Sequence, residues 1–142
     1  MKDRLFDAWA SFRTLPRWVQ AWVGLCLVPV NLAPFFMLHT ATGRAAALAM
    51  SVVIVTNVPI LLWERGMSKR LSLPHLVAWV PLCLWLGLRL VSDAPMSQSE
   101  TALAWTLFVV NIVSLAFDAI DSAKWLRGDR AIAGAASHEN TH

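Results

Sequence analysis

Carboxylates and one histidine stand close to the ends of apolar segments, where they could bind protons, cations or lipid headgroups. Asp118 and Asp121 are three residues apart, so in a helix they share a face. Glu64 and His75 lie on either side of the connector between two other apolar segments. A carboxylate with an imidazole can transfer protons near neutral pH, and carboxylates alone can hold a divalent ion. These residues are the first candidates for chemistry in this chain.

The segment that ends with these aspartates carries a polar stripe along one helical face. From Ala104 to Trp125, residues of the stripe recur at alternating steps of three and four, and they include Asn111 and Ser114. A polar stripe on an otherwise apolar helix turns away from lipid. We predict that this face looks into the helix bundle or toward another chain.

Antiparallel packing would bring this stripe to the depth of the neighbouring connector. We therefore predict one polar cluster that contains Glu64, Arg65, His75, Asp118 and Asp121. In a structural interpretation, Asp118 pairs with Arg65 and Asp121 pairs with Lys124, and these pairs fix the helix ends. In a functional interpretation, the cluster is a site for a lipid headgroup, an ion or a proton.

Three asparagines lie well inside apolar runs, and with Ser114 they predict a polar layer near mid-membrane: Asn31, Asn57 and Asn111. Two interpretations remain open. The amides could line a path for a solute. Alternatively, they could donate to carbonyls that Pro29, Pro34, Pro59 and Pro81 leave free four residues earlier, those of Leu25, Val30, Val55 and Val77.

Other reactive residues give weaker signals. Cys26 and Cys83 lack any paired spacing, so buried thiols are favoured over a disulfide or a zinc site. His39 and His75 are expected at opposite ends of the bundle and cannot share one haem iron within a chain. No phosphate-binding loop or protease motif occurs. We expect no metal and no cofactor, although phospholipid could bind.

Four uncharged apolar runs must position these residues, at 18–38, 45–63, 71–88 and 101–117. A hydrocarbon core of ~30 Å needs about 20 helical residues and tolerates about 17. With 57% hydrophobic and 15% charged residues, the 142-residue chain has too few charges for a soluble bundle. We predict an all-α, polytopic membrane protein with four antiparallel transmembrane helices, at about 17–38, 44–64, 72–91 and 98–122.

The basic residues predict the orientation. Ten of the twelve Lys and Arg residues lie on the side of both termini and the middle connector, and only Arg44 and Arg89 lie opposite. Basic residues near span ends stay in the cytoplasm, so both termini are expected there, in a bacterial-type inner membrane. Arg89, with Asp93 four residues further on, is expected to extend outward and anchor the end of its span. The cations expected to contact lipid headgroups rather than nucleic acid are Arg13, Arg17, Lys69, Arg70, Lys124 and Arg127.

Three regions follow from this organisation. Residues 1–16 should form a short interfacial amphipathic helix, because its apolar face gathers Leu5, Phe6, Trp9 and Phe12. Residues 17–127 form the four-helix transmembrane domain. Its last helix should begin at a capping box, from Ser97 to Glu100. Residues 128–142 are small and polar, and are expected to be a disordered cytoplasmic tail.

The sequence favours a small inner-membrane protein that self-associates or serves as an accessory or assembly subunit of a larger membrane complex. No catalytic set is complete, which favours a protein without enzymatic activity. Two alternatives remain. One is an oligomeric channel or small transporter that uses the polar face of the fourth span. The other is a lipid-headgroup enzyme that holds a divalent ion with Asp118, Asp121 and Glu64. The sequence identifies neither partner nor substrate.

Overall fold

The computed structural model describes residues 2–129 and 132–133, which form helices and no sheet. The elements are α1 (Lys2–Thr14), α2 (Arg17–Ala21), η1 (Trp22–Leu27), α3 (Val28–Leu32), η2 (Ala33–Phe36), α4 (Ala41–Glu64), η3 (Lys69–Leu71), α5 (Ser72–Val91) and α6 (Gln98–Leu126). Within this described part, four stretches are long and apolar enough to cross a membrane: Arg17–Phe36, Ala41–Glu64, Lys69–Val91 and Gln98–Leu126. The prediction of an all-helical, four-helix membrane bundle is confirmed.

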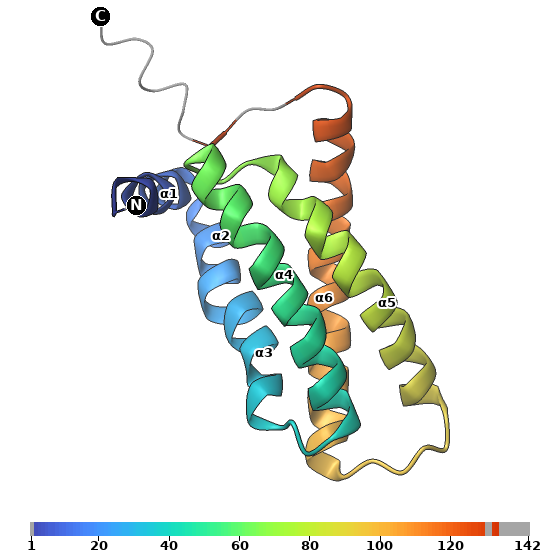
Figure 1. Cartoon of the computed structure of the whole chain (residues 1–142). Coiled ribbons are helices and arrows are strands. Elements are labelled where there is room, and N and C mark those ends of the chain that lie inside the picture. The colour runs from blue at the N-terminus through green and yellow to red at the C-terminus, as the bar shows by residue number, and fades with distance from the viewer. Residues whose placement is uncertain (1, 130–131, 134–142) are drawn as a thin grey trace, which may run out of the picture.

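The four spans alternate in direction, and α1 and the last turn of α6 lie at the same end of the bundle (Figure 1). We call this the basic end, because α1, the α4–α5 connector and the end of α6 carry most of the cations there. The opposite end holds the other two connectors. Helix α6 packs along α5, and both α4 and α6 contact the first span. Short connectors enforce this antiparallel order.

The first span is not a continuous α-helix. It passes from α2 through the π-helical η1 into α3, and ends in the 3₁₀ turn η2. Pro29 lies in α3, just after η1, and Pro34 lies within η2. Proline has no amide hydrogen and its ring clashes with the carbonyl four residues earlier, so the hydrogen-bond register changes around it. We call Arg17–Phe36 span one from here on.

Side-chain caps set two of the helix starts. The Thr40 hydroxyl accepts from the Gly43 amide at 2.9 Å, so α4 begins at Ala41, three residues before the predicted start. The Ser97 hydroxyl accepts from the Glu100 amide at 3.2 Å, as the capping-box spacing predicts. The second half of that box does not form, because the Glu100 carboxylate is used elsewhere.

Helix α1 lies across the basic end rather than along the bundle (Figure 1). Its buried residues Ala8 and Ser11 face the connector. The Ser11 hydroxyl accepts from the Met67 amide at 2.9 Å and donates to the Ala133 carbonyl at 2.7 Å. The predicted apolar face, with Phe6 and Trp9, stays exposed, as an interfacial helix requires.

Part of the expected tail is described, and its residues Ile132 and Ala133 contact the α4–α5 connector. Ile132 forms an isolated antiparallel bridge with Ser68, and the Ala133 amide donates to the Met67 carbonyl at 3.1 Å. The tail prediction for 130–131 and 134–142 lies outside the described residues.

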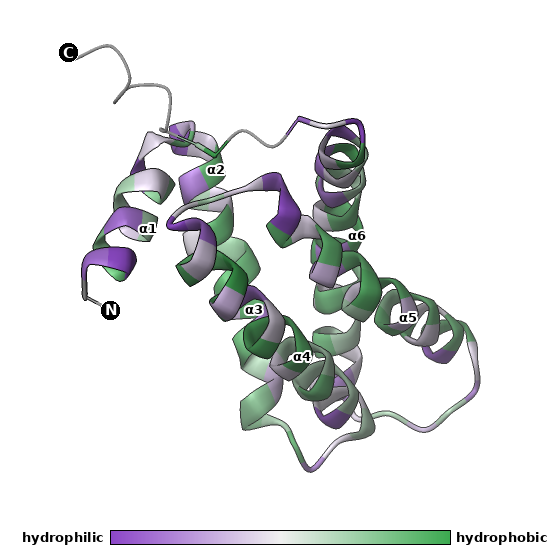
Figure 2. Ribbon diagram, turned by 45° about the horizontal axis from the view of Figure 1, so that its top comes forward, coloured by the Kyte–Doolittle hydropathy of each residue, from purple (hydrophilic) through white to green (hydrophobic). Residues whose placement is uncertain are grey.

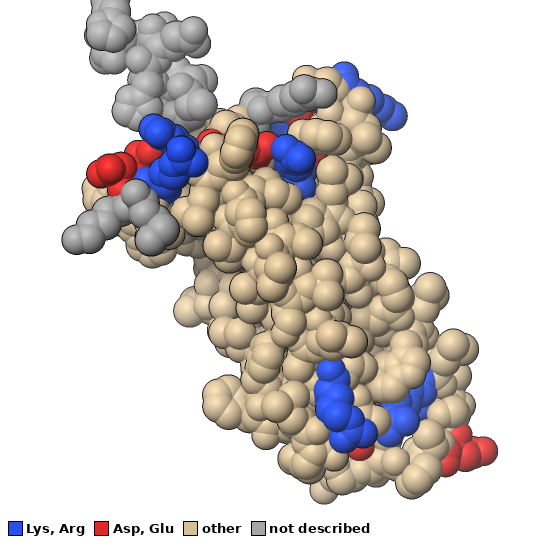
Figure 3. All heavy atoms as spheres, viewed as in Figure 1, with Lys and Arg blue, Asp and Glu red and all other residues tan. Residues whose placement is uncertain are grey.

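The core is apolar and centred on α5 and α6. Trp79, Leu86 and Leu107 are its largest apolar side chains with almost no exposed surface. The outside of the spans is apolar as well, as the predominantly green helices in Figure 2 show. In the face drawn in Figure 3, charged side chains gather at the two ends and leave an uncharged waist between them. An apolar outer surface of this kind is stable in contact with the acyl chains of a lipid bilayer.

Candidate functional site

His75, in the second turn of α5, is the centre of a polar cluster near the basic end. Its Nδ1 lies 3.3 Å from Oδ1 of Asp118 on α6, and its Nε2 lies 2.8 Å from Nδ2 of Asn57 on α4. The ring stacks on Trp79, with centroids 4.3 Å apart and planes 12° apart. Three helices thus supply one contact each to a single imidazole, which is only 18% exposed.

These contacts fit one tautomer of the imidazole. With the Asn57 amide nitrogen toward Nε2, that ring nitrogen accepts, which matches the tautomer whose hydrogen is on Nδ1, facing Asp118. The same Asn57 nitrogen also donates to the Leu71 carbonyl at 3.1 Å. Its Oδ1 and Nε1 of Trp79 are buried without a hydrogen-bond partner among the described residues. The pocket therefore holds one imidazole between one carboxylate and one amide.

The Asp118 carboxylate is held from its own helix as well. Its Oδ2 lies 3.4 Å from the Ser114 hydroxyl, one turn earlier in α6. One turn further on, Ser122 shares a 2.7 Å hydrogen bond with Ser72 at the start of α5. With Asn111, which contacts Asn31 of span one, the polar stripe of α6 thus faces α5 and span one, into its own bundle.

Other residues of the predicted cluster have different partners. Glu64 accepts from the Ser68 hydroxyl and lies 3.7 Å from Arg70. Arg65 caps α4 in the left-handed region, with φ of 53°, and lies 3.9 Å from Asp7 of α1. The expected pairing of Asp118 with Arg65 is therefore wrong. Because Arg65 follows the last turn of α4, its side chain leaves the bundle.

The second expected ion pair is also absent. Asp121 forms no ion pair with Lys124 in the described part of the chain. Among the same residues, no group of three His, Cys, Asp or Glu side chains is close enough to hold a metal ion. The three carboxylates of the enzyme alternative are thus not brought together.

The predicted asparagine layer divides into two sites. Asn31 and Asn111 pair with each other, and Nδ2 of Asn31 also donates to the Leu27 carbonyl at 3.0 Å. Asn57 instead joins the His75 cluster. None of these hydrogen bonds reaches the carbonyls of Leu25, Val30, Val55 or Val77 that the prolines were expected to leave for them, so that expectation is wrong. Asn31 instead reaches the Leu27 carbonyl, four residues earlier in span one.

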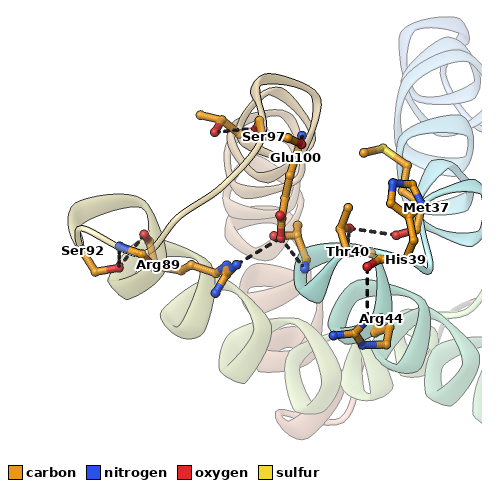
Figure 4. Close-up of polar contacts among 12 residues, drawn as sticks. Met37, His39, Thr40, Arg44, Arg89, Ser92, Ser97 and Glu100 are labelled. Carbon is orange, nitrogen blue, oxygen red and sulfur yellow. Dashed lines mark hydrogen bonds and ion pairs between the residues drawn. The ribbon is translucent and has the colours of Figure 1, made fainter.

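The opposite end holds a charged contact that the sequence interpretation missed (Figure 4). Oε1 of Glu100 accepts from the Thr42 amide at 3.0 Å and from Nη2 of Arg89 at 3.2 Å. Glu100 is 6% exposed. A carboxylate beside the free amides of a helix start is stabilised by the helix dipole as well as by the arginine. The Glu100 contact therefore joins α4, α5 and α6.

Arg89 was expected to extend outward as an anchor, but its guanidinium instead pairs with Glu100. The guanidinium turns back toward α6 and lies 5.4 Å from the ring centre of Trp85. Glu100 was recognised only as a capping residue. The signal that could have identified the pair was an acid in the first turn of one span with an arginine at the same end of its neighbour.

The cations predicted to contact lipid headgroups lie at the basic end, on several elements. Lys69 pairs with Asp129, and Arg70 lies over the Trp125 ring at 6.0 Å. Four are exposed and have no ion pair with another described residue: Arg13, Arg17, Lys124 and Arg127. Cys26 and Cys83 are free thiols, of which Cys83 is buried and Cys26 is partly exposed.

The fold and its apolar waist define a multi-pass helical membrane protein. Comparison with protein-family models, with curated proteins and with solved structures found no match to this chain. The functional argument therefore depends on the geometry alone.

Proposed function

We propose that this protein is a small membrane module that associates through span one, either with a second copy or with a subunit of a larger membrane complex. The observation that carries the proposal is how little of span one its own chain covers. In its most apolar stretch 11% of residues are buried, against 22% in Ala41–Glu64 and 33% in each of the other two spans. Span one is the helix with most surface left for another protein.

The exposed face of span one contains a position without a side chain. Gly24 lies in the π-helical segment beside Leu25, which is 81% exposed, and a Cβ at Gly24 would meet no atom within 4 Å. Lipid chains are as apolar as leucine, so helices in a bilayer associate by close packing and favour small residues at the contact. Gly24 offers such an approach on the outside of the bundle.

The polar contacts favour this assembly role over the two alternatives. The polar face of α6 is occupied by α5 and span one, so a pathway between protomers would need the bundle to open. The carboxylates of the enzyme alternative have separate partners. An accessory or self-associating module needs neither a pathway nor a catalytic set, only a stable bundle with an available apolar face.

Native mass spectrometry from a mild detergent tests the proposal. The wild type should appear as an oligomer or with a stoichiometric membrane-protein partner. Gly24→Leu should release a folded monomer, because the new side chain fills the approach without touching its own chain. Ala116→Leu, at an exposed position of α6, is the matched control and should behave as the wild type. A wild-type monomer without a partner, or an intact complex of Gly24→Leu, would count against the proposal.

The same proposal includes an orientation, with the basic end in the cytoplasm of a bacterial-type inner membrane. After Cys26 and Cys83 are replaced by alanine, single cysteines can report it. An impermeant thiol reagent should label Ser92→Cys in intact spheroplasts. It should label Thr14→Cys only in inverted vesicles. The reverse pattern would overturn the orientation.

A further inference from the structure

A groove on the outer surface of the bundle runs between α4 and α5. Its volume is ≈ 330 Å³. The α4 wall consists of Val52, Thr56 and Ile60, which lie on successive turns and extend over about 12 Å. The Thr56 hydroxyl donates to the Val52 carbonyl of its own helix, so this wall presents no free donor. The groove is therefore an apolar channel of about two helical turns.

The α5 wall is also apolar, and the groove ends in a cation. Leu73, Pro74 and Val77 form this wall, and Arg70 of η3 lies at the end toward the basic end of the bundle. The Arg70 side chain is 48% exposed, and its Cζ lies 6.0 Å from the ring centre of Trp125. Arginine and tryptophan together are typical of the level at which lipid headgroups lie.

Arg70 has donors left for an anion. Its Nη1 lies 3.7 Å from Oε1 of Glu64, a long ion pair, while Oε2 of Glu64 accepts from the Ser68 hydroxyl. A guanidinium carries five N–H donors in a planar fork that matches a phosphate. Glu64 is the carboxylate that competes with such a phosphate.

We infer that this groove binds one glycerophospholipid from the leaflet at the basic end. One acyl chain fills the space between the α4 wall and the α5 wall, and the lipid phosphate binds Arg70. Water in the groove would lack hydrogen-bond partners along its apolar length, whereas an acyl chain would gain contact on both sides. The groove lies away from the exposed face of span one that carries the proposed association, so either proposal can fail alone.

The headgroup contact can be tested on the delipidated full chain in detergent. Dioleoyl phosphatidylglycerol is titrated, and native mass spectrometry gives the dissociation constant for the first lipid bound. Arg70→Gln should weaken this first binding about fivefold, the effect of one basic residue at a membrane surface. Arg65→Gln is the matched control, because Arg65 is a half-exposed cation of the same connector that does not line the groove. It should bind as the wild type.

Glu64→Gln distinguishes a phosphate site from a merely structural ion pair. Removing the competing carboxylate should tighten the first binding, opposite in sign to Arg70→Gln. If Arg70 and Glu64 only stabilise the fold, both substitutions should change lipid binding in the same direction or leave it unchanged. Either of these results overturns the headgroup assignment.

The acyl-chain position is tested by filling the groove. Thr56→Phe should lower the affinity for the first lipid at least tenfold, because the ring occupies the α4 wall. Val55→Phe, the neighbouring position, faces lipid outside the groove and should have no effect. Equal affinities of the two variants overturn the inference. So does uniform binding of all lipids without a distinct first site in the wild type.

Discussion

The side-chain amides of Asn31 and Asn111 donate to each other across the bundle. Nδ2 of Asn31 lies 2.9 Å from Oδ1 of Asn111, and Nδ2 of Asn111 lies 3.1 Å from Oδ1 of Asn31. Both residues are buried, at 2% and 0% exposure. This two-way contact fastens span one, the span least covered by its own chain, to the centre of α6.

A double-mutant cycle on this pair should reveal strong coupling. Asn31→Leu or Asn111→Leu should each lower the free energy of unfolding by about 1–2 kcal/mol, because the remaining amide loses its partner in an apolar setting. The double variant should cost less than the sum of the two, since no amide is then stranded. Unfolding by SDS in mixed micelles measures all four proteins. Additive effects would show that the pair contributes no coupling.

The His75 contact predicts different effects for two neighbouring aspartates. Asp118→Asn weakens the contact of Asp118 with His75 and should destabilise the bundle by about 2 kcal/mol, as for a hydrogen bond to a charged group. Asp121→Asn, three residues further along α6, should cost less than about 0.5 kcal/mol because Asp121 forms no described ion pair.

Thermal unfolding in detergent, followed by circular dichroism, compares these variants directly. The Asp121 variant controls for the loss of one negative charge at this end of α6. Equal losses of stability in both variants would mean that net charge matters here and the His75 contact does not.

Much of the fold was predictable from the sequence, because the thickness of a membrane fixes the length that an apolar run needs in order to cross it. The four spans, their alternation and the amphipathic α1 follow from this. The proximity of His75 to Asp118 was also predictable, since antiparallel neighbours bring the start of one helix to the level of the end of the next. Helix starts were less accurate, as at Ala41, because a cap such as Thr40 extends a helix beyond its apolar run.

Side-chain partners could not be obtained in the same way. The partner of Asn31 depends on the direction in which span one presents this side chain, and the π-helical turn changes that direction. The pattern of apolar residues does not reveal the extra residue that such a turn contains. Glu100 was expected to complete its own capping box, but the start of α4 lies closer. Which partner a side chain contacts depends on distances between helices, to within about the length of one hydrogen bond. The spacing of residues along one helix carries no information about these distances.

The contact of Glu100 with Arg89 and Thr42 predicts graded effects at the opposite end. Glu100→Gln can still accept from the Thr42 amide and should cost about 1 kcal/mol. Glu100→Ala strands both the amide and the guanidinium and should cost about 3 kcal/mol, the lower range for breaking a buried pair.

Asp93→Asn is the control for this end, because Asp93 is an exposed acid without an ion pair among the described residues. It should leave the free energy of unfolding unchanged in the SDS titration. A loss for Asp93→Asn equal to that for Glu100→Ala would indicate that Arg89 pairs with Asp93 and would contradict its pairing with Glu100.

Two glycines in and beside span one predict opposite outcomes for the same substitution. At Gly43, a Cβ would lie 1.9 Å from the Met37 carbonyl oxygen and 2.5 Å from its carbon. These are backbone atoms of the tight turn between span one and α4, so they cannot move aside as a side chain could. Gly43→Ala should lower the free energy of unfolding by about 2–3 kcal/mol.

At Gly24 the new methyl group meets no atom within 4 Å. Gly24→Ala should therefore leave stability unchanged or raise it by up to about 1 kcal/mol, because alanine restricts the unfolded chain more than glycine does. Unfolding of the two variants by SDS at the same detergent fraction makes the comparison. If Gly43→Ala is as stable as Gly24→Ala, the chain does not pass as closely over the start of α4 as this structure places it, and the cap at Thr40 must be arranged differently.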